Sequence, residues 1–247
     1  MKNDEETQDT FYHGRILVLQ KGKGYRFSVD SPLLADFIQT EEYDELLELG
    51  TGSGIISLLL STKSFKHITA VEIQEPLVDL ARRNVRLNKL EGRITIVHQD
   101  LRAFHPERRF DVIFSNPPYI KAKQGHLSSD EEKSIAKHEL KCDIFDIMAK
   151  TAELLKKEGR AYFIFPARRE QDLRHVAERN DLRMKTVRFV LPRRRSAPHF
   201  ILYECGFGSH KENLLPPLVL FDEQGDYTLE AKNIFAGRKD AADVQKP

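Results

Sequence analysis

The sequence predicts an α/β protein built on a doubly wound, mostly parallel sheet. From residue 45 onward, short apolar runs alternate with segments whose apolar residues recur at helical spacing, as strands and helices do in that fold class. A glycine-rich stretch at residues 50–54 follows the first run and opens a helical segment, the strand–loop–helix order of many ligand-binding sheets. Three further runs end at Glu72, Asp100 and just before Asn116, where such sheets carry their ligand sites.

Seven strands are expected in this sheet, with helices between most of them. The strands are predicted at residues 45–49, 68–72, 94–98, 110–115, 160–165, 184–190 and 200–204. The helices are predicted at residues 31–38, 53–60, 76–90, 144–155 and 168–179. No helix separates the last two strands, so one of them should run antiparallel at the sheet edge. Residues 15–20 and 25–27 flank a turn at residues 21–24 and predict an N-terminal β-hairpin.

Composition is that of a soluble globular protein and disfavours several function classes. Charged residues make up 31% of the chain and the net charge is +1, so no global basic field points to nucleic acid. The two cysteines, Cys142 and Cys205, lack metal-ligand spacing, which argues against a metal site or a disulfide scaffold and favours a reducing compartment. No apolar signal core or membrane-length run is present, so we expect a cytoplasmic protein without a membrane partner.

The glycine-rich loop and the acids around it predict a nucleoside cofactor. Glycines allow positive φ and close approach of the backbone to a ligand, and the N–H groups of the following helix point at that ligand. Glu72 can accept from a ribose diol, and Asp100 can accept from an adenine amine. Glu48 directly precedes the loop, where it would repel a pyrophosphate but tolerate an ammonium or sulfonium group. This favours S-adenosylmethionine over NAD; glycines and acids that serve only packing are the alternative.

A rigid lip, Asn116-Pro117-Pro118-Tyr119, follows the strand at residues 110–115. The prolines fix φ and remove two N–H donors, so the lip offers carbonyl acceptors. The Asn116 side-chain oxygen and the Pro117 carbonyl can both accept from one planar NH2 group, and Tyr119 can stack on the ring or amide that carries it. Such a lip suits the presentation of a conjugated amino group to an electrophile; an ordinary proline-rich turn is the alternative.

This lip matches the signature of amino methyltransferases that use S-adenosylmethionine, whose acceptors are adenine N6, cytosine N4 or a glutamine amide. More closely, roughly residues 15–235 resemble the bacterial valine-tRNA adenine-N6 methyltransferases, which act on adenine 37 of the anticodon loop. The resemblance rests on the glycine loop, the lip and four further stretches: residues 24–30, Lys137-His138-Glu139 with Cys142, residues 217–220 and residues 226–228. Ser31-Pro32 departs from the form that many of these proteins carry there.

The resemblance implies a Rossmann-like class I methyltransferase that transfers methyl from S-adenosylmethionine to an adenine N6 in tRNA, at position 37 of a valine tRNA. One alternative is a glutamine N5-methyltransferase acting on a protein such as a release factor. Relatives of that kind typically carry a helical N-terminal domain, whereas here a hairpin and one helix precede Gly50. A second alternative is N6-adenine methylation of rRNA or DNA. A non-catalytic relative that binds a partner is disfavoured by the intact acids and Asn116.

The expected site residues fall into three groups, and no metal ligands are expected. The catalytic residues are Asn116, Pro117, Pro118 and Tyr119. The cofactor-binding residues are Tyr25, Phe27, Asp30, Glu48, Gly50, Thr51, Gly52, Gly54, Glu72, Ile73, Asp100, Leu101 and Asn116; by resemblance, the stretch with Tyr25, Phe27 and Asp30 closes over the methionine end of the cofactor. The substrate-binding residues, whose positive charge would grip phosphates, are Lys121, Lys123, His138, Arg193, Arg194 and Arg195.

The domain boundaries follow from the same pattern. With 247 residues and no evident linker, the chain should form one methyltransferase domain at residues 11–238. Its expected parts are a hairpin and lid at 11–30, a catalytic core at 31–207 and a C-terminal extension at 208–238. The flexible ends are expected at residues 1–10 and 239–247.

Overall fold

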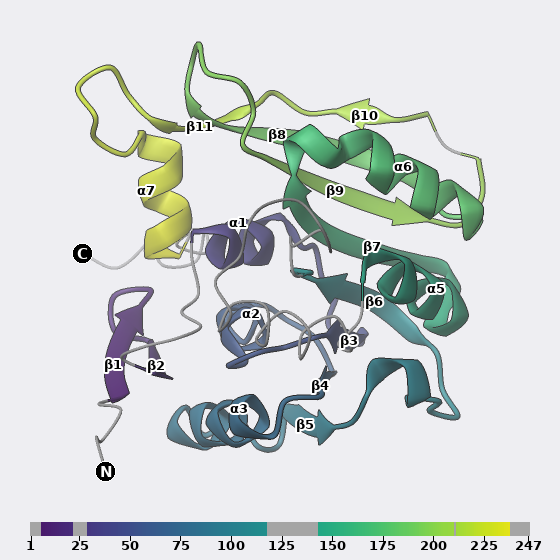
Figure 1. Cartoon of the computed structure of the whole chain (residues 1–247). Helices are drawn as coiled ribbons and strands as arrows, with labels where there is room; N and C mark the ends of the chain where they lie inside the picture. The colour runs from purple at the N-terminus through teal and green to yellow at the C-terminus, as the bar shows by residue number, and fades with distance from the viewer. Residues whose placement is uncertain (1–5, 22–28, 118–142, 210, 238–247) are drawn as a thin grey trace, which may run out of the picture.

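The computed structural model describes residues 6–21, 29–117, 143–209 and 211–237, which form one large sheet with helices on both faces and a separate two-stranded sheet near the N-terminus (Figure 1). The strands of this sheet are β3 (Glu45–Leu49), β4 (His67–Glu72), β5 (Ile94–His98), β6 (Phe110–Ser115), β7 (Leu155–Pro166), β8 (Arg183–Arg193), β9 (Phe200–Gly206), β10 (Asn213–Leu214) and β11 (Leu218–Phe221). Their order is β10-β8-β9-β7-β6-β3-β4-β5, with β11 also paired to β8.

The seven predicted strands are β3 to β9, and the mixed, mostly parallel sheet is confirmed. Two short strands, β10 and β11, extend it to nine and come from the C-terminal extension. The antiparallel strand is β9, which lies between β7 and β8 and not at the sheet edge as expected. The connection from β7 to β8 leaves one strand position vacant between these two strands. The hairpin that follows β8 then places β9 in that position.

Helices bury apolar residues against both faces of the sheet. They are α1 (Asp30–Phe37), α2 (Ile55–Leu60), α3 (Glu75–Leu87), α5 (Ile144–Leu154), α6 (Glu170–Arg179) and α7 (Leu229–Ala236), with short 3-10 turns η1 (Leu101–Ala103) and η2 (Ala167–Arg169). Neighbouring residues of β3 point into opposite cores: Leu46 packs with α1, α2 and α3, whereas Leu47 packs with α5 and α6. No helix in the described ranges is long and apolar enough to cross a membrane.

The N-terminal hairpin forms, and the strand predicted at residues 15–20 is its second strand, β2 (Ile16–Lys21), rather than its first. The hairpin pairs β1 (Glu6–Phe11) with β2 in antiparallel register, so the prediction that residues 6–10 are a flexible arm is wrong. The turn between them uses positive φ at Tyr12, His13 and Gly14. The expected second strand at residues 25–27 lies outside the described residues. β1 is mostly polar and lacks the alternation of apolar and polar residues by which a strand is predicted from sequence. Its pairing with β2 in the structure identifies it as a strand.

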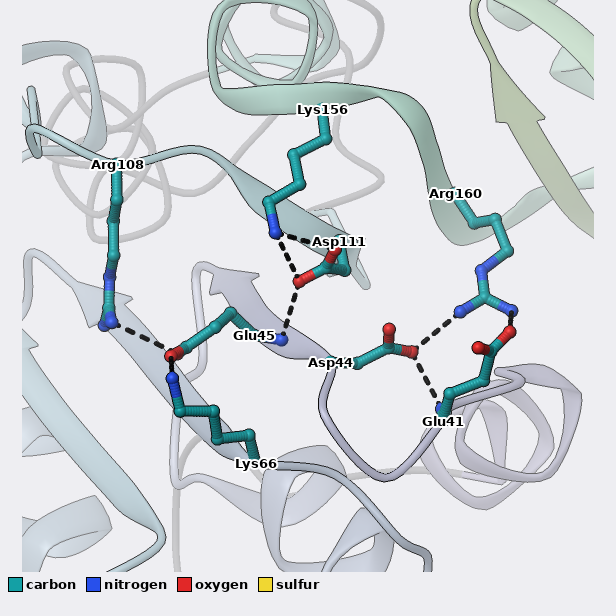
Figure 2. Close-up of polar contacts among 8 residues, drawn as sticks. All are labelled: Glu41, Asp44, Glu45, Lys66, Arg108, Asp111, Lys156 and Arg160. Atoms are coloured by element: carbon teal, nitrogen blue, oxygen red, sulfur yellow. Dashed lines mark hydrogen bonds and ion pairs between the residues drawn. The ribbon is translucent and has the colours of Figure 1, made fainter.

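Charged residues at the amino ends of the strands form mutual ion pairs (Figure 2). Asp111 of β6 accepts from Lys156 at 2.8 Å and from the backbone N–H of Glu45 at 3.0 Å. Arg160 donates to Asp44 at 2.7 Å, and the other members of the network are Glu41, Lys66 and Arg108. Because these acids are already paired with lysine and arginine side chains, we assign a structural role to this edge. The carboxyl edge carries the candidate site.

Candidate active site

The sheet brings four of the predicted positions to one edge. β6, β3, β4 and β5 are neighbours and parallel, so their carboxyl ends lie side by side. In that order they are followed or ended by Asn116, Gly50, Glu72 and Asp100. Adjacent strands lie about 4.8 Å apart, so this row spans roughly 14 Å. An elongated ligand can therefore contact all four strand ends at once.

The glycine loop is fastened to the end of β4. The N–H groups of Gly50 and Thr51 both donate to the Val71 carbonyl, at 2.9 and 3.0 Å. Gly50 has φ of +74°, and a Cβ added to it would meet no atom of the described residues within 4 Å. Gly54 has φ of +85°, and a Cβ added to it would lie 3.4 Å from the Cβ of Ala81 in α3. The first glycine therefore leaves open space over the loop, whereas the last allows α3 to pack closely.

Glu48 lies beneath the loop and organises it. Its side chain is 1% exposed, and it accepts hydrogen bonds from the hydroxyls of Thr51, at 2.6 Å, and Ser57 of α2. Burial raises the pKa of Glu48 to about 7, the nearby Glu72 charge adds to the rise, and the two hydroxyls oppose it. The residue thus supplies a buried acid whose charge a neighbouring cation would stabilise.

The raised pKa of Glu48 predicts a specific pH dependence of stability. The folded-state pKa of Glu48 lies above its ordinary value of 4.5, so folding favours the protonated carboxyl group. The contribution of Glu48 to stability is therefore complete below pH 4.5 and is lost as pH rises through about 7. Between those limits the free energy of unfolding should fall by on the order of 3 kcal/mol in the wild type relative to Glu48→Gln. Urea unfolding of both proteins across this range measures the difference, and parallel pH curves would contradict the raised pKa.

Glu72 is held at the end of β4 by backbone N–H groups. One carboxylate oxygen accepts from Gly52 of the loop at 2.9 Å, and the other accepts from Ile73 and Gln74 at 2.9 and 2.8 Å. A carboxylate has about four acceptor positions, and hydrogen bonds within the described residues use three of them. Glu72 therefore fixes the middle of the loop.

Asp100 ends the row and is engaged by Arg102. The guanidinium Nε lies 3.0 and 3.1 Å from the two carboxylate oxygens, and this side chain holds the pKa of Asp100 below its usual range. Asp100 also accepts from the Arg102 backbone N–H and so caps the η1 turn. An adenine amine that binds Asp100 must share this carboxylate with Arg102, a contact that the spacing of the motif does not reveal.

Ser115, a residue not predicted for the site, joins the lip to the loop. Its buried hydroxyl donates to the carbonyl of Leu49 at 2.6 Å, so the end of β6 is fixed to the residue before Gly50. Asn116 is half-buried and follows directly. The available signal was a hydroxyl directly after the apolar run Val112–Phe114 of β6, where a buried polar group needs a defined partner.

The remaining predicted site residues are placed unevenly. Asp30 begins α1, is 5% exposed and accepts from the Ser31 N–H at 3.0 Å. Leu101 is buried in η1 and Ile73 is half-buried after β4. Arg193, Arg194 and Arg195 are exposed at the β8–β9 connection. Seven predictions lie outside the described residues: Tyr25, Phe27, Pro118, Tyr119, Lys121, Lys123 and His138.

The donor set of this edge fits a ligand with a ribose and a positive charge. Among the described contacts, Glu72 keeps one acceptor position for a ribose hydroxyl, Glu48 provides a buried acid, and Gly50 leaves the backbone of the loop open. In the described part of the chain, no three His, Cys, Asp or Glu side chains converge as a metal site would require.

Comparisons with known proteins identify the family. The methyltransferase small domain family matches residues 25–180. A protein of Phocaeicola vulgatus named tRNA1(Val) (adenine(37)-N6)-methyltransferase is 30% identical over 204 residues, which is 83% of each chain. One of the same name from Aliivibrio fischeri is 27% identical over 76% of this chain and 80% of its own.

The fold also matches a solved structure. The crystal structure of an Agrobacterium tumefaciens protein, described as a predicted O-methyltransferase, superposes with a TM-score of 0.66 at 17% identity, covering 85% of this chain and 96% of that one. At this identity the match supports the fold alone, which is that of class I methyltransferases. The family match, this fold and the site at the carboxyl edge of the sheet show that the chain belongs to the methyltransferase small domain family. It is an S-adenosylmethionine-dependent methyltransferase.

Proposed function

We propose that this enzyme methylates the exocyclic N6 amine of an adenine in tRNA, at position 37 of a valine tRNA. The observation that carries the proposal is the relative of that name, which aligns over 83% of both chains. The placement of Asn116 beside the glycine loop agrees with it, because Ser115 ties the two segments together. We further propose that residues 11–238 act as a single methyltransferase domain, with β1 extending its start to residue 6.

The chemistry assigned to the chain is positioning of the amine. When bound, S-adenosylmethionine supplies a methyl group made electrophilic by the positively charged sulfur. Asn116 Oδ1 and the Pro117 carbonyl accept the two N6 hydrogens, which aims the nitrogen lone pair and raises its electron density. Tyr119 stacks on the adenine. No strong base is needed, because the amine proton becomes acidic once nitrogen carries the methyl group.

Exposed arginines lie at the same edge of the sheet as Asn116. β8 runs parallel to β7, since both are antiparallel to β9, so the β8–β9 connection leaves the carboxyl edge. The Ala167 N–H donates to the His199 carbonyl at 3.0 Å, which fixes that connection to the end of β7. Arg168, absent from the sequence-based prediction, is exposed beside it. An adenine in the site would bring its flanking phosphates toward Arg168 and the arginines of the connection, Arg193–Arg195.

Removing two of these charges should weaken RNA binding specifically. For Arg194→Ala/Arg195→Ala we expect the KM for tRNA to rise about tenfold and the salt dependence of binding to decrease, with kcat and the KM for S-adenosylmethionine little changed. The matched control is Arg179→Ala/Arg183→Ala, which removes the same charge from exposed residues at the end of α6 and the start of β8. Equal effects of both double variants would refute a specific role for the connection.

The function itself is tested by the destination of the methyl group. Labelled S-adenosylmethionine is supplied with bulk tRNA and, in parallel, with purified release factors, and the tRNA is digested to nucleosides. The proposal expects label in N6-methyladenosine, after which valine tRNA with adenine 37 replaced by guanine should accept none. Label only in the release factor would replace the proposal with glutamine methylation. Label in neither, with cofactor binding intact, would exclude both acceptors.

A further inference from the structure

Asn84 of α3 and Asn88, which caps the C-terminus of that helix, make backbone hydrogen bonds along one edge of β2 as a neighbouring strand would. Asn84 Oδ1 accepts from the Leu19 N–H at 2.7 Å, and its Nδ2 donates to the Leu19 carbonyl at 3.1 Å. Asn88 repeats this pattern with Leu17, at 2.9 and 2.7 Å. Four helical residues rise about 6 Å and two strand residues about 6.7 Å, so the two spacings match. The hairpin is thereby held on α3 in a defined register.

Asn84 also reaches the cofactor loop. Its Nδ2 donates to the Ser53 carbonyl at 3.0 Å, and the side chain is 0% exposed. Both amide hydrogens of Asn84 are therefore used, one on the hairpin and one on the loop. The second donor bond of Asn88 goes instead to the Asn84 carbonyl within α3, at 2.8 Å. Only the first of the two asparagines joins the hairpin to the loop.

The loop is held from two sides at adjacent residues. Glu72 fixes the Gly52 N–H, and Asn84 fixes the carbonyl of Ser53. Glu6 of β1 pairs with Arg83 of α3 at 2.8 Å, but an ion pair this exposed contributes little. Among the described hydrogen bonds and ion pairs of the hairpin, the buried amide of Asn84 is therefore the one that also binds the loop directly.

We propose that Asn84 is a positioning residue for the cofactor, which fixes the glycine loop in register with the N-terminal hairpin. Aspartate at this position keeps the acceptor but loses both donor bonds and turns a lone pair toward two carbonyls. Leucine loses all three bonds. The proposal rests on the cofactor class of the enzyme and is independent of which nucleic acid or protein it methylates.

The test compares Asn84→Asp in α3 with Asn88→Asp at the C-terminal cap of that helix, because each variant loses two donor bonds. Affinity for S-adenosylhomocysteine is measured by calorimetry well below each melting temperature. We expect at least tenfold weaker binding and a matching rise in the KM for S-adenosylmethionine in Asn84→Asp, with kcat at saturation changed less than about threefold. Asn88→Asp should stay within about twofold of the wild type. Similar affinities in the two variants, whether both retained or both lost, overturn the proposal.

Hydrogen exchange of the wild type provides a second measurement that does not depend on folding of the variants. If hairpin and loop are coupled, a ligand that orders the loop must also stabilise the hairpin, because such coupling is reciprocal. Saturating S-adenosylhomocysteine should slow amide exchange in β2 (Ile16–Lys21), including in Asn88→Asp, where the link through Asn84 remains. Unchanged exchange in β2 of the wild type overturns the proposal.

Discussion

Replacing Asn116 with alanine is expected to lower kcat by about a thousandfold or more while leaving the Kd for S-adenosylmethionine within about threefold. Asn116 follows β6 at the carboxyl edge, and the Ser115–Leu49 hydrogen bond fixes that strand end beside the glycine loop. Alanine keeps the backbone and removes only the amide group proposed to accept from the amine. Single-turnover methylation of tRNA, with cofactor binding measured separately, distinguishes lost chemistry from lost binding.

Asn116→Asp serves as the matched control for this prediction. Aspartate has the same shape and retains an oxygen acceptor, so it should recover part of the activity that alanine loses. Ser115→Ala gives a second comparison, because it removes the tether to Leu49 and leaves Asn116 in place. We expect its loss of kcat to be smaller than that of Asn116→Ala. Full activity of Asn116→Ala would eliminate the proposed role of this side chain.

Replacing Glu72 should have the second largest effect, this time on cofactor binding. In Glu72→Ala the N–H groups of Gly52, Ile73 and Gln74 lose their acceptor, and the proposed bond to the ribose is lost too. Hydrogen bonds to charged groups contribute about 1.5–3 kcal/mol each. We therefore expect cofactor affinity to fall by at least about thirtyfold, together with a lower melting temperature. Glu72→Gln, which retains one oxygen acceptor, should show a smaller loss.

An analogue of the cofactor product separates ribose binding from loop support. For the wild type, 2′-deoxy-S-adenosylhomocysteine should bind more weakly than S-adenosylhomocysteine. If Glu72 accepts from the diol, that difference should shrink in Glu72→Gln, because the partner of the missing hydroxyl is already impaired. An undiminished difference would mean that Glu72 supports only the loop.

Local sequence was sufficient for much of this site. The glycine loop, Glu72 and Asn116 each follow a short apolar run, and the parallel strands then place them along one edge. Periodicity also predicted the seven main strands, because their alternate residues pack into two cores. The same signal failed for β1, whose sequence ETQDTF is mostly polar.

Long-range contacts were outside the reach of sequence patterns. The position of β9 between β7 and β8 depends on which strand positions the crossover leaves vacant. The role of Asn84 depends on bonds to residues 65 and 31 positions away, and an asparagine on a helix has no sequence mark that distinguishes such a link from an exposed position. The contact of Arg102 with Asp100 is local, two positions along the chain, but it depends on the η1 turn, which the apolar pattern does not predict.

The sequence by itself determined the fold class and the position of the glycine loop and of the acids at the strand ends, because strand–loop–helix order and apolar periodicity are encoded in neighbouring residues. Only the tertiary structure decided that Glu72 and Asn84 hold the loop from two sides, that Ser115 ties the lip to it, and that Arg193–Arg195 share its edge. These relations join residues far apart in the chain. They arise when buried polar groups must find partners in the packed sheet, a requirement that fixes contacts without leaving a local pattern.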